Sequence, residues 1–127
     1  PDLTESRNAS AQEERRRGFE AMAKEAEAPY IITNIHHAEE GIMRRANSVV
    51  VCSTDWYALR LYETAKQYSA GIIGFDNIGF IDLLKIPLDS VSYDIKKTAQ
   101  YALDYIEAGK LSEKPISHTV VARGSVS

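Results

Sequence analysis

Polar side chains gather at three places where a strand-like run of apolar residues ends. In an open parallel sheet, small ligands bind in the crevice beyond the carboxyl ends of the strands. Carboxylate, amide and imidazole groups there can pair with neighbouring hydroxyls of a sugar. These residue types therefore predict a site for a polyhydroxylated small molecule, although local turn chemistry explains Asp and Asn at such places equally well. The three groups are His36-His37, Ser53-Thr54-Asp55 and Asp76-Asn77.

Alternating helices and strands must position these groups. Ser10 and Glu13 form a capping-box pattern, Thr54 is a predicted N-cap, and Gly109 is a predicted helix stop. Apolar periodicity predicts helices over residues 11–26, 38–46, 55–68 and 95–108, a short helical segment ending at 84, strands over 30–35, 49–52, 71–75 and 119–121, and an extended segment around 91. Parallel strands need crossover helices, so the fold class is α/β, with an open, mostly parallel sheet and helices on both faces.

Size and charge limit the classes of protein that the chain can represent. Its 127 residues, 44% hydrophobic and 26% charged, suit one soluble domain or part of one. A formal charge of -3 gives no overall positive field, so this chain alone is not expected to bind nucleic acid. Cys52 is the only cysteine, which favours a reducing compartment, and the apolar runs are too short to span a membrane. A cytoplasmic location without membrane association is the prediction.

Two connections look too short for a complete lobe. A six-residue strand over 30–35 covers about 20 Å, whereas a helix over 38–46 returns only about 13 Å. The return after Tyr68 is similarly abrupt. Residues are therefore expected to be missing near Ala46 and near Tyr68.

Three other features have ordinary structural explanations. His36 and His37 lie beside Glu39 and Glu40, but adjacent residues do not converge on one ion, so no metal site and no cofactor are predicted. Cys52 lies within an apolar strand and is expected to pack in the core rather than act as a nucleophile. A helical stripe of apolar side chains predicts core packing or a subunit contact; its members are Trp56, Leu59 and Tyr62.

Five short motifs occur in one order from about Ser10 to Ser125. Together they resemble the LacI/GalR (lactose-repressor) family of bacterial transcriptional regulators. An arginine precedes a Gly-aromatic pair by three residues in the first motif, and the later motifs follow strand ends. They are Arg15-Arg16-Arg17-Gly18-Phe19, Cys52-Ser53-Thr54-Asp55, Ile73-Gly74-Phe75-Asp76-Asn77, Ile86-Pro87-Leu88-Asp89-Ser90-Val91 and Arg123-Gly124-Ser125.

The resemblance implies a function in sensing rather than in catalysis. Residues 1–127 would form part of a periplasmic-binding-protein-like (type I) effector domain, mainly its C-terminal lobe. Members of the family hold a small effector, often a sugar, between two lobes and form homodimers. They bind operator DNA through a helix-turn-helix domain, which this sequence does not contain.

The resemblance also assigns site residues. Arg15 would grip effector hydroxyls or a carboxylate, and Asp76 would accept hydrogen bonds from hydroxyls. Thr54 stands where many members have asparagine, which puts the same bidentate contact in doubt. The complete set of candidate ligand-binding residues is Arg15, Asp76, Thr54, Asp55, His36 and Tyr93.

Two rival functions remain open from the sequence. An extracytoplasmic sugar-binding protein of a transporter would share the crevice but would need an export signal. A small α/β enzyme could use Asp55, Asp76 and His36 for acid-base chemistry. No nucleophile-base pair or phosphate loop of recognisable spacing supports the enzyme.

Overall fold

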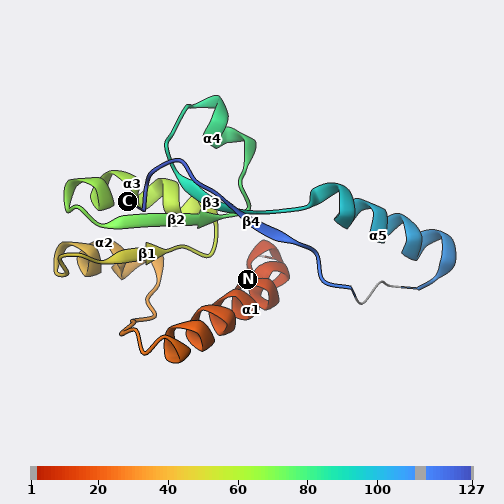
Figure 1. Ribbon diagram of the computed structural model, residues 1–127, viewed down its shortest axis with the longest axis horizontal. Helices are drawn as coiled ribbons and strands as arrows, with labels where there is room; N and C mark the ends of the chain where they lie inside the picture. The colour runs from red at the N-terminus through yellow and green to blue at the C-terminus, as the bar shows by residue number, and fades with distance from the viewer. Residues whose placement is uncertain (1–2, 111–113, 127) are drawn as a thin grey trace.

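The computed structural model describes residues 3–110 and 114–126, with residues 3–10 described by their backbone alone. Figure 1 shows the arrangement of its helices and strands. In chain order the elements are α1 (Leu3–Glu25), α2 (Ile35–Met43), β1 (Val49–Val51), α3 (Asp55–Gln67), β2 (Gly71–Phe75), α4 (Gly79–Leu83), β3 (Asp89–Tyr93), α5 (Ile95–Ala108) and β4 (His118–Val121).

A single open sheet with the order β1-β2-β3-β4 organises the chain. β1, β2 and β3 run parallel, and β4 pairs antiparallel with β3. Because parallel neighbours need a crossover, α3 connects β1 to β2, and the short α4 lies between β2 and β3. The predicted α/β class with an open, mostly parallel sheet is confirmed.

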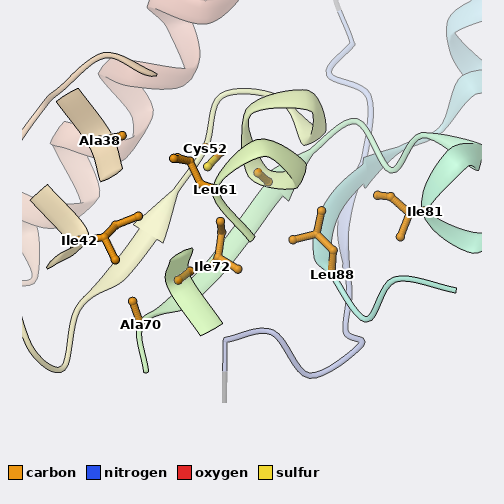
Figure 2. Packing of buried hydrophobic residues seen from close by; sticks show 10 residues of the cluster. Ala38, Ile42, Cys52, Leu61, Ala70, Ile72, Ile81 and Leu88 are labelled. Carbon is orange, nitrogen blue, oxygen red and sulfur yellow. The ribbon is translucent and has the colours of Figure 1, made fainter. Parts of the chain in front are cut away.

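The apolar core lies between the sheet and the helices α2 and α3 (Figure 2). Ala58 and Ala65 are fully buried on α3, and their small side chains let the helix approach the sheet closely. Ile72 of β2 points toward that helix and is 2% exposed. The other buried apolar residues of the cluster are Ala38, Ile42, Cys52, Leu61, Ala70, Ile81 and Leu88.

Helices α1 and α5 contribute no described residue to this core cluster. The guanidinium of Arg15 on α1 lies over the ring of Phe75, whose side chain points to the face of the sheet opposite to Ile72. α1 therefore reaches the second face at the carboxyl end of β2. α5 contains no buried residue, and Figure 1 shows it beyond the ends of β3 and β4.

The predicted strand over residues 30–35 is wrong. Residues 30–34 form no helix or strand, and the side chains of Ile31 and Ile32 are 59% and 44% exposed. A strand exists only when a neighbour completes its hydrogen bonds, and no strand in the described part of the chain pairs with this segment. The side chain of Asn34 instead caps α2, which begins at Ile35.

The distance argument for missing residues near Ala46 depended on that strand. Since residues 30–34 are not a strand that must be retraced, a nine-residue α2 is long enough to reach β1. After α3, Ser69 adopts a positive φ of 55°, and the Ala70 N–H donates to the Ala65 carbonyl, which closes the turn into β2. The geometric argument for missing residues is therefore weakened at both connections, and their absence stays a prediction.

The ends of α3 and α5 agree with the prediction, whereas α2, predicted over residues 38–46, spans Ile35–Met43 because Asn34 caps it. The Thr54 side chain accepts a hydrogen bond from the Tyr57 N–H, and Gly109 ends α5 in the left-handed conformation with φ 69°. α1, in contrast, does not begin at Ser10 but continues back to Leu3. Neither glycine nor proline interrupts residues 3–13, so nothing in the backbone stops the helix at the capping-box pattern.

Within the described ranges, no helix has the length and apolar character needed to cross a membrane.

Candidate functional site

The carboxyl end of β2 brings together Arg15 and Asp76, residues 61 positions apart in the sequence. Arg15 Nη2 donates to Asp76 Oδ1 over 3.1 Å, and Arg15 Nη1 donates to the Ser53 carbonyl over 2.7 Å. The Arg15 guanidinium carbon lies 3.9 Å from the centre of the Phe75 ring. One guanidinium thus connects α1 to the ends of β1 and β2. A long cation fixed on three sides is a preorganised group for a polar ligand.

Asp76 is an ionisable group in a partly buried position. Burial raises the pKa of its carboxyl, the Arg15 guanidinium opposes that change, and the negative charge of Asp55 adds to it. The Arg15 and Asp76 side chains are 26% and 27% exposed, so both remain accessible to a small molecule. The site therefore offers a cation and a carboxylate that a ligand can reach without unfolding any element.

An aromatic row begins under Arg15 and continues along the sheet. The Phe75 ring is 5.8 Å from the His118 ring, which in turn is 6.0 Å from the Tyr93 ring, measured between centres. Tyr93 and His118 face each other in the β3–β4 register. Aromatic rings beside hydrogen-bonding groups form the kind of surface on which the apolar face of a sugar stacks.

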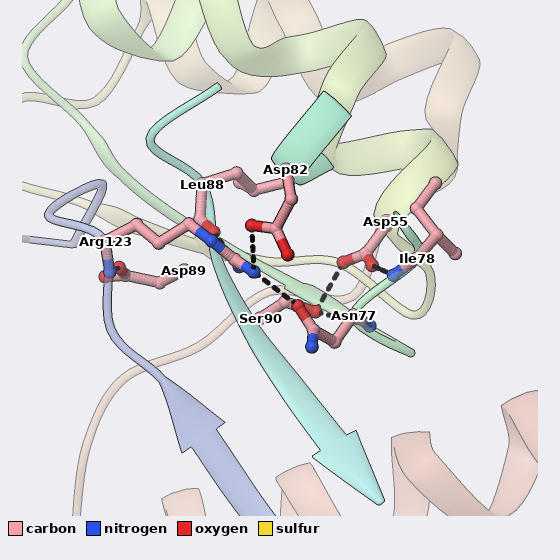
Figure 3. Close-up of polar contacts among 8 residues, drawn as sticks. All are labelled: Asp55, Asn77, Ile78, Asp82, Leu88, Asp89, Ser90 and Arg123. Atoms are coloured by element: carbon pink, nitrogen blue, oxygen red, sulfur yellow. Dashed lines mark hydrogen bonds and ion pairs between the residues drawn. The ribbon is translucent and has the colours of Figure 1, made fainter. Parts of the chain in front are cut away.

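The turn after β2 has a strained backbone. Asp76 has φ 108° and Asn77 has φ 54°, backbone angles that residues other than glycine seldom adopt. The Asn77 N–H donates to Ser90 Oγ over 2.9 Å, and the Ile78 N–H donates to Asp55 Oδ2 over 2.8 Å. These hydrogen bonds hold the turn from two neighbouring elements (Figure 3).

Asp55 has a structural position. Its side chain is fully buried, Ser90 Oγ donates to its Oδ1 over 2.6 Å, and its Oδ2 accepts from Ile78. Gly74 lies directly against it, and a Cβ at Gly74 would be 3.1 Å from Asp55 Cα. Asp55 connects α3, β2 and β3, and in this conformation it has no free surface for a ligand.

The other candidates lie apart from the Arg15–Asp76 pair. Thr54 Oγ1 accepts from the Tyr57 N–H over 3.4 Å, so its hydroxyl caps α3. The exposed His36 lies at the start of α2, where its backbone N–H donates to Asn34 Oδ1. Neither side chain takes part in the described contacts of Arg15 or Asp76, and Tyr93 approaches them only through the aromatic row.

Arg123 belongs to the site region although sequence reasoning did not select it. Its Nη2 donates to Asn77 Oδ1 over 2.7 Å, and its Nη1 donates to the Leu88 carbonyl over 2.9 Å. The signal was present as the Arg123-Gly124-Ser125 motif. The contact between Arg123 and Asn77 could not be predicted from the motif, because 46 positions separate the two residues.

Asp89 anchors the segment that carries Arg123. Its carboxylate accepts from the backbone N–H groups of Arg123, Gly124 and Val126, the last two over 2.7 and 3.0 Å. Burial alone raises the pKa of Asp89, but the hydrogen bonds from this backbone outweigh burial, and the pKa lies below its ordinary value. The carboxylate therefore stabilises the fold in its ionised form.

This electrostatic balance predicts acid sensitivity. A lowered folded-state pKa contributes stability above the unfolded value of about 3.9, and that contribution is lost as pH falls through the lower folded value. We expect the free energy of unfolding to drop below about pH 4, with a smaller slope in Asp89→Asn. Urea denaturation from pH 3 to pH 7 measures both, and equal slopes in the two proteins would contradict the assignment.

Cys52 is a core residue and not part of the site. Burial, assisted by the negative charge of Asp55, raises the pKa of the Cys52 thiol to about 12. The thiol is therefore protonated at neutral pH and unsuited to nucleophilic attack, as expected for a core residue. Among the residues that the structure describes, no three His, Cys, Asp or Glu side chains lie together in a metal-binding group.

Two solved structures from Escherichia coli share this fold. One is a sugar-binding transcriptional regulator of the LacI family complexed with phosphate, with a TM-score of 0.65, 20% identity, and coverage of 89% of this chain and 49% of that chain. The other is the transcriptional repressor ascG, with a TM-score of 0.62, 21% identity and the same coverages. No protein-family model and no curated protein sequence matches.

These structures define the class of fold. The chain has the α/β architecture found in LacI-type regulators, and the predicted resemblance is confirmed at the level of fold. It spans about half the length of each similar protein.

Proposed function

We propose that this chain is the effector-sensing part, mainly the C-terminal lobe, of a LacI-type bacterial transcriptional regulator, and that its effector is a sugar or a related small molecule. The observation that carries the proposal is the Arg15–Asp76 pair over Phe75 at the carboxyl end of β2. The pair occurs in a fold shared with regulators, one of them described as sugar-binding. The effector lies against this end of the sheet and places hydroxyls between the two charged side chains.

The chemistry of the site is binding, not catalysis. A sugar hydroxyl donates to the Asp76 carboxylate and accepts from the Arg15 guanidinium, replacing part of their mutual hydrogen bond. Phe75, His118 and Tyr93 provide apolar ring surface beside these groups. Acid-base catalysis by Asp55 is disfavoured because both of its oxygens already accept hydrogen bonds in the interior.

Sensing requires a second set of contacts from another lobe. An effector shifts an equilibrium between two arrangements only by its difference in affinity for them. The lobe described here supplies one side of the cleft. A helix-turn-helix domain outside these 127 residues contacts operator DNA in the cytoplasm, and effector binding changes its affinity.

We also propose a homodimer. An open hollow of about 350 Å³ lies between α3 and the segment after α4, and its lining includes neither Arg15 nor Asp76. Leu59 and Tyr62 of the predicted apolar stripe line it, and Trp56 of the same stripe is 58% exposed. A second copy packing on this side of α3 buries the stripe, and sedimentation of the full-length protein measures its stoichiometry.

A binding screen tests the proposed function. Isothermal titration of the full-length protein with neutral pentoses and hexoses is expected to identify at least one ligand. Inorganic phosphate forms a separate arm, because one similar regulator was solved with phosphate. Failure of all these compounds to bind at millimolar concentration would contradict the proposed ligand class.

Arg15→Ala is expected to weaken binding of the identified ligand by about 10- to 100-fold, since a hydrogen bond to a charged group contributes about 1.5–3 kcal/mol. Arg16→Ala is the matched control, because the Arg16 side chain is 49% exposed and, in the described part of the chain, pairs with Glu13 and Glu20 on its own helix. Equal losses in the two variants would place the ligand elsewhere.

A further inference from the structure

The turn that carries Asp76 cannot rely on its own backbone preferences. Two consecutive residues with positive φ, Asp76 and Asn77, persist only if surrounding groups hold them. Asp55 and Ser90 bind the backbone of this turn at Ile78 and Asn77. Those contacts leave the Asn77 side chain to be held by another group.

Arg123 holds that side chain. Its Nη2 donates to Asn77 Oδ1, and its Nη1 donates to the carbonyl of Leu88, the residue before β3. The same Nη2 lies 3.0 Å from Asp82 Oδ1, whose side chain is 74% exposed. Arg123 itself is 15% exposed, so its guanidinium spans the turn and β3 from a protected position.

The segment around Arg123 is fixed independently of the turn. Asp89 accepts from three backbone N–H groups between Arg123 and Val126, and Ser125 Oγ accepts from the Asp89 N–H over 2.7 Å. Gly124 has φ 106°, which lets these N–H groups converge on one carboxylate. The backbone at Arg123 is therefore anchored to β3 by contacts that do not depend on the hydrogen bond between Arg123 and Asn77.

We infer that the C-terminal segment 122–126 is a positioning element for the ligand site, and that Arg123, through Asn77, holds Asp76 in the orientation that faces Arg15. Arg123 is a positioning residue rather than a ligand contact. The inference rests on the proposed function for its biological meaning. The mechanical coupling from Arg123 to Asp76 can be measured without a ligand.

The test compares three variants of the full-length protein by NMR. Arg123→Met removes the guanidinium and keeps an unbranched stem, whereas Asn77→Gly removes the amide at a position where glycine accepts the positive φ. Asp82→Ala is the matched control, since it removes only the exposed partner of Arg123. Amide hydrogen exchange at Asn77 and Ile78 and the carboxyl titration of Asp76 are the readouts.

In Arg123→Met and in Asn77→Gly, the exchange rates at Asn77 and Ile78 are expected to increase about tenfold over the unmodified protein, while exchange in α3 does not change. Tenfold is the factor for loss of one hydrogen bond to a charged group. The pKa of Asp76 is expected to fall toward its ordinary value as the side chain becomes less buried. Asp82→Ala leaves both readouts unchanged.

A purely structural role for Arg123 gives a different pattern. Exchange then rises equally in the turn and in α3, the Asp76 titration does not move, and the inference is overturned. If Arg123→Met fails to fold, Asn77→Gly alone decides between these patterns. If exchange at Asn77 and Ile78 and the Asp76 titration change as expected but the protein binds no sugar, the coupling from Arg123 to Asp76 holds and the proposed function is contradicted.

Discussion

Gly74→Ala is expected to lower the free energy of unfolding by about 3 kcal/mol, at the upper end of what overpacking costs. A Cβ at this position would overlap Asp55 Oδ1 and lie 3.2 Å from Asp55 Cγ. Asp55 cannot move aside cheaply, because Ser90 and Ile78 both donate to its carboxylate. The added methyl group must therefore separate β2 from the start of α3. Urea denaturation followed by far-ultraviolet circular dichroism measures the loss.

Gly18→Ala is the matched control for that experiment. Gly18 lies inside α1, and a Cβ there has no neighbour within 4 Å among the residues that the structure describes. Alanine favours a helix interior by about 0.5–1 kcal/mol over glycine, so stability should be unchanged or slightly higher. A Gly74→Ala protein as stable as Gly18→Ala would contradict the close approach of β2 and α3.

Asp55→Ala is expected to cost about 2–6 kcal/mol, because two donors lose their acceptor at about 1–3 kcal/mol each. The donors are Ser90 Oγ and the Ile78 N–H, and the carboxylate is fully buried. Ligand binding should weaken as well, since the turn bearing Asp76 loses one of its supports. Denaturation and titration calorimetry on the same preparations separate the two effects.

Glu63→Ala provides the comparison for Asp55→Ala. Glu63 is an exposed carboxylate on the same helix, eight residues after Asp55, and it lines the hollow between α3 and the segment after α4. Its removal should change stability by less than about 0.5 kcal/mol. Similar losses in the two variants would mean that Asp55 is not the connection between α3, β2 and β3.

The elements that could be predicted from the sequence are those with strong local signals. Thr54 ahead of α3 and Gly109 after α5 mark helix ends through their own side chain or backbone, so neither requires knowledge of distant residues. β2 is marked by the apolar run Gly71–Phe75. The segment 30–34 carries the same kind of signal but has no neighbouring strand within residues 3–110 and 114–126, and propensity alone cannot provide one.

The candidate site was predictable in its residue types and only partly in its geometry. Arg15 and Asp76 were selected through a resemblance of short motifs, and the structure places them in contact. Asp55 was selected for its position after a strand, yet it lies in the interior as a structural acceptor. Arg123 was not selected, because a hydrogen bond across 46 positions leaves no local pattern.

The sequence by itself determined the α/β class, most helix boundaries and the residue types at the strand ends, because these follow from short-range periodicity and capping chemistry. Only the tertiary structure decided which carboxylate faces solvent and which is buried. Asp55 and Asp76 each follow a strand, but Asp55 is enclosed by Gly74 and Ser90, whereas Asp76 meets Arg15 at an accessible edge. Burial depends on packing between distant segments, and local sequence does not encode that packing.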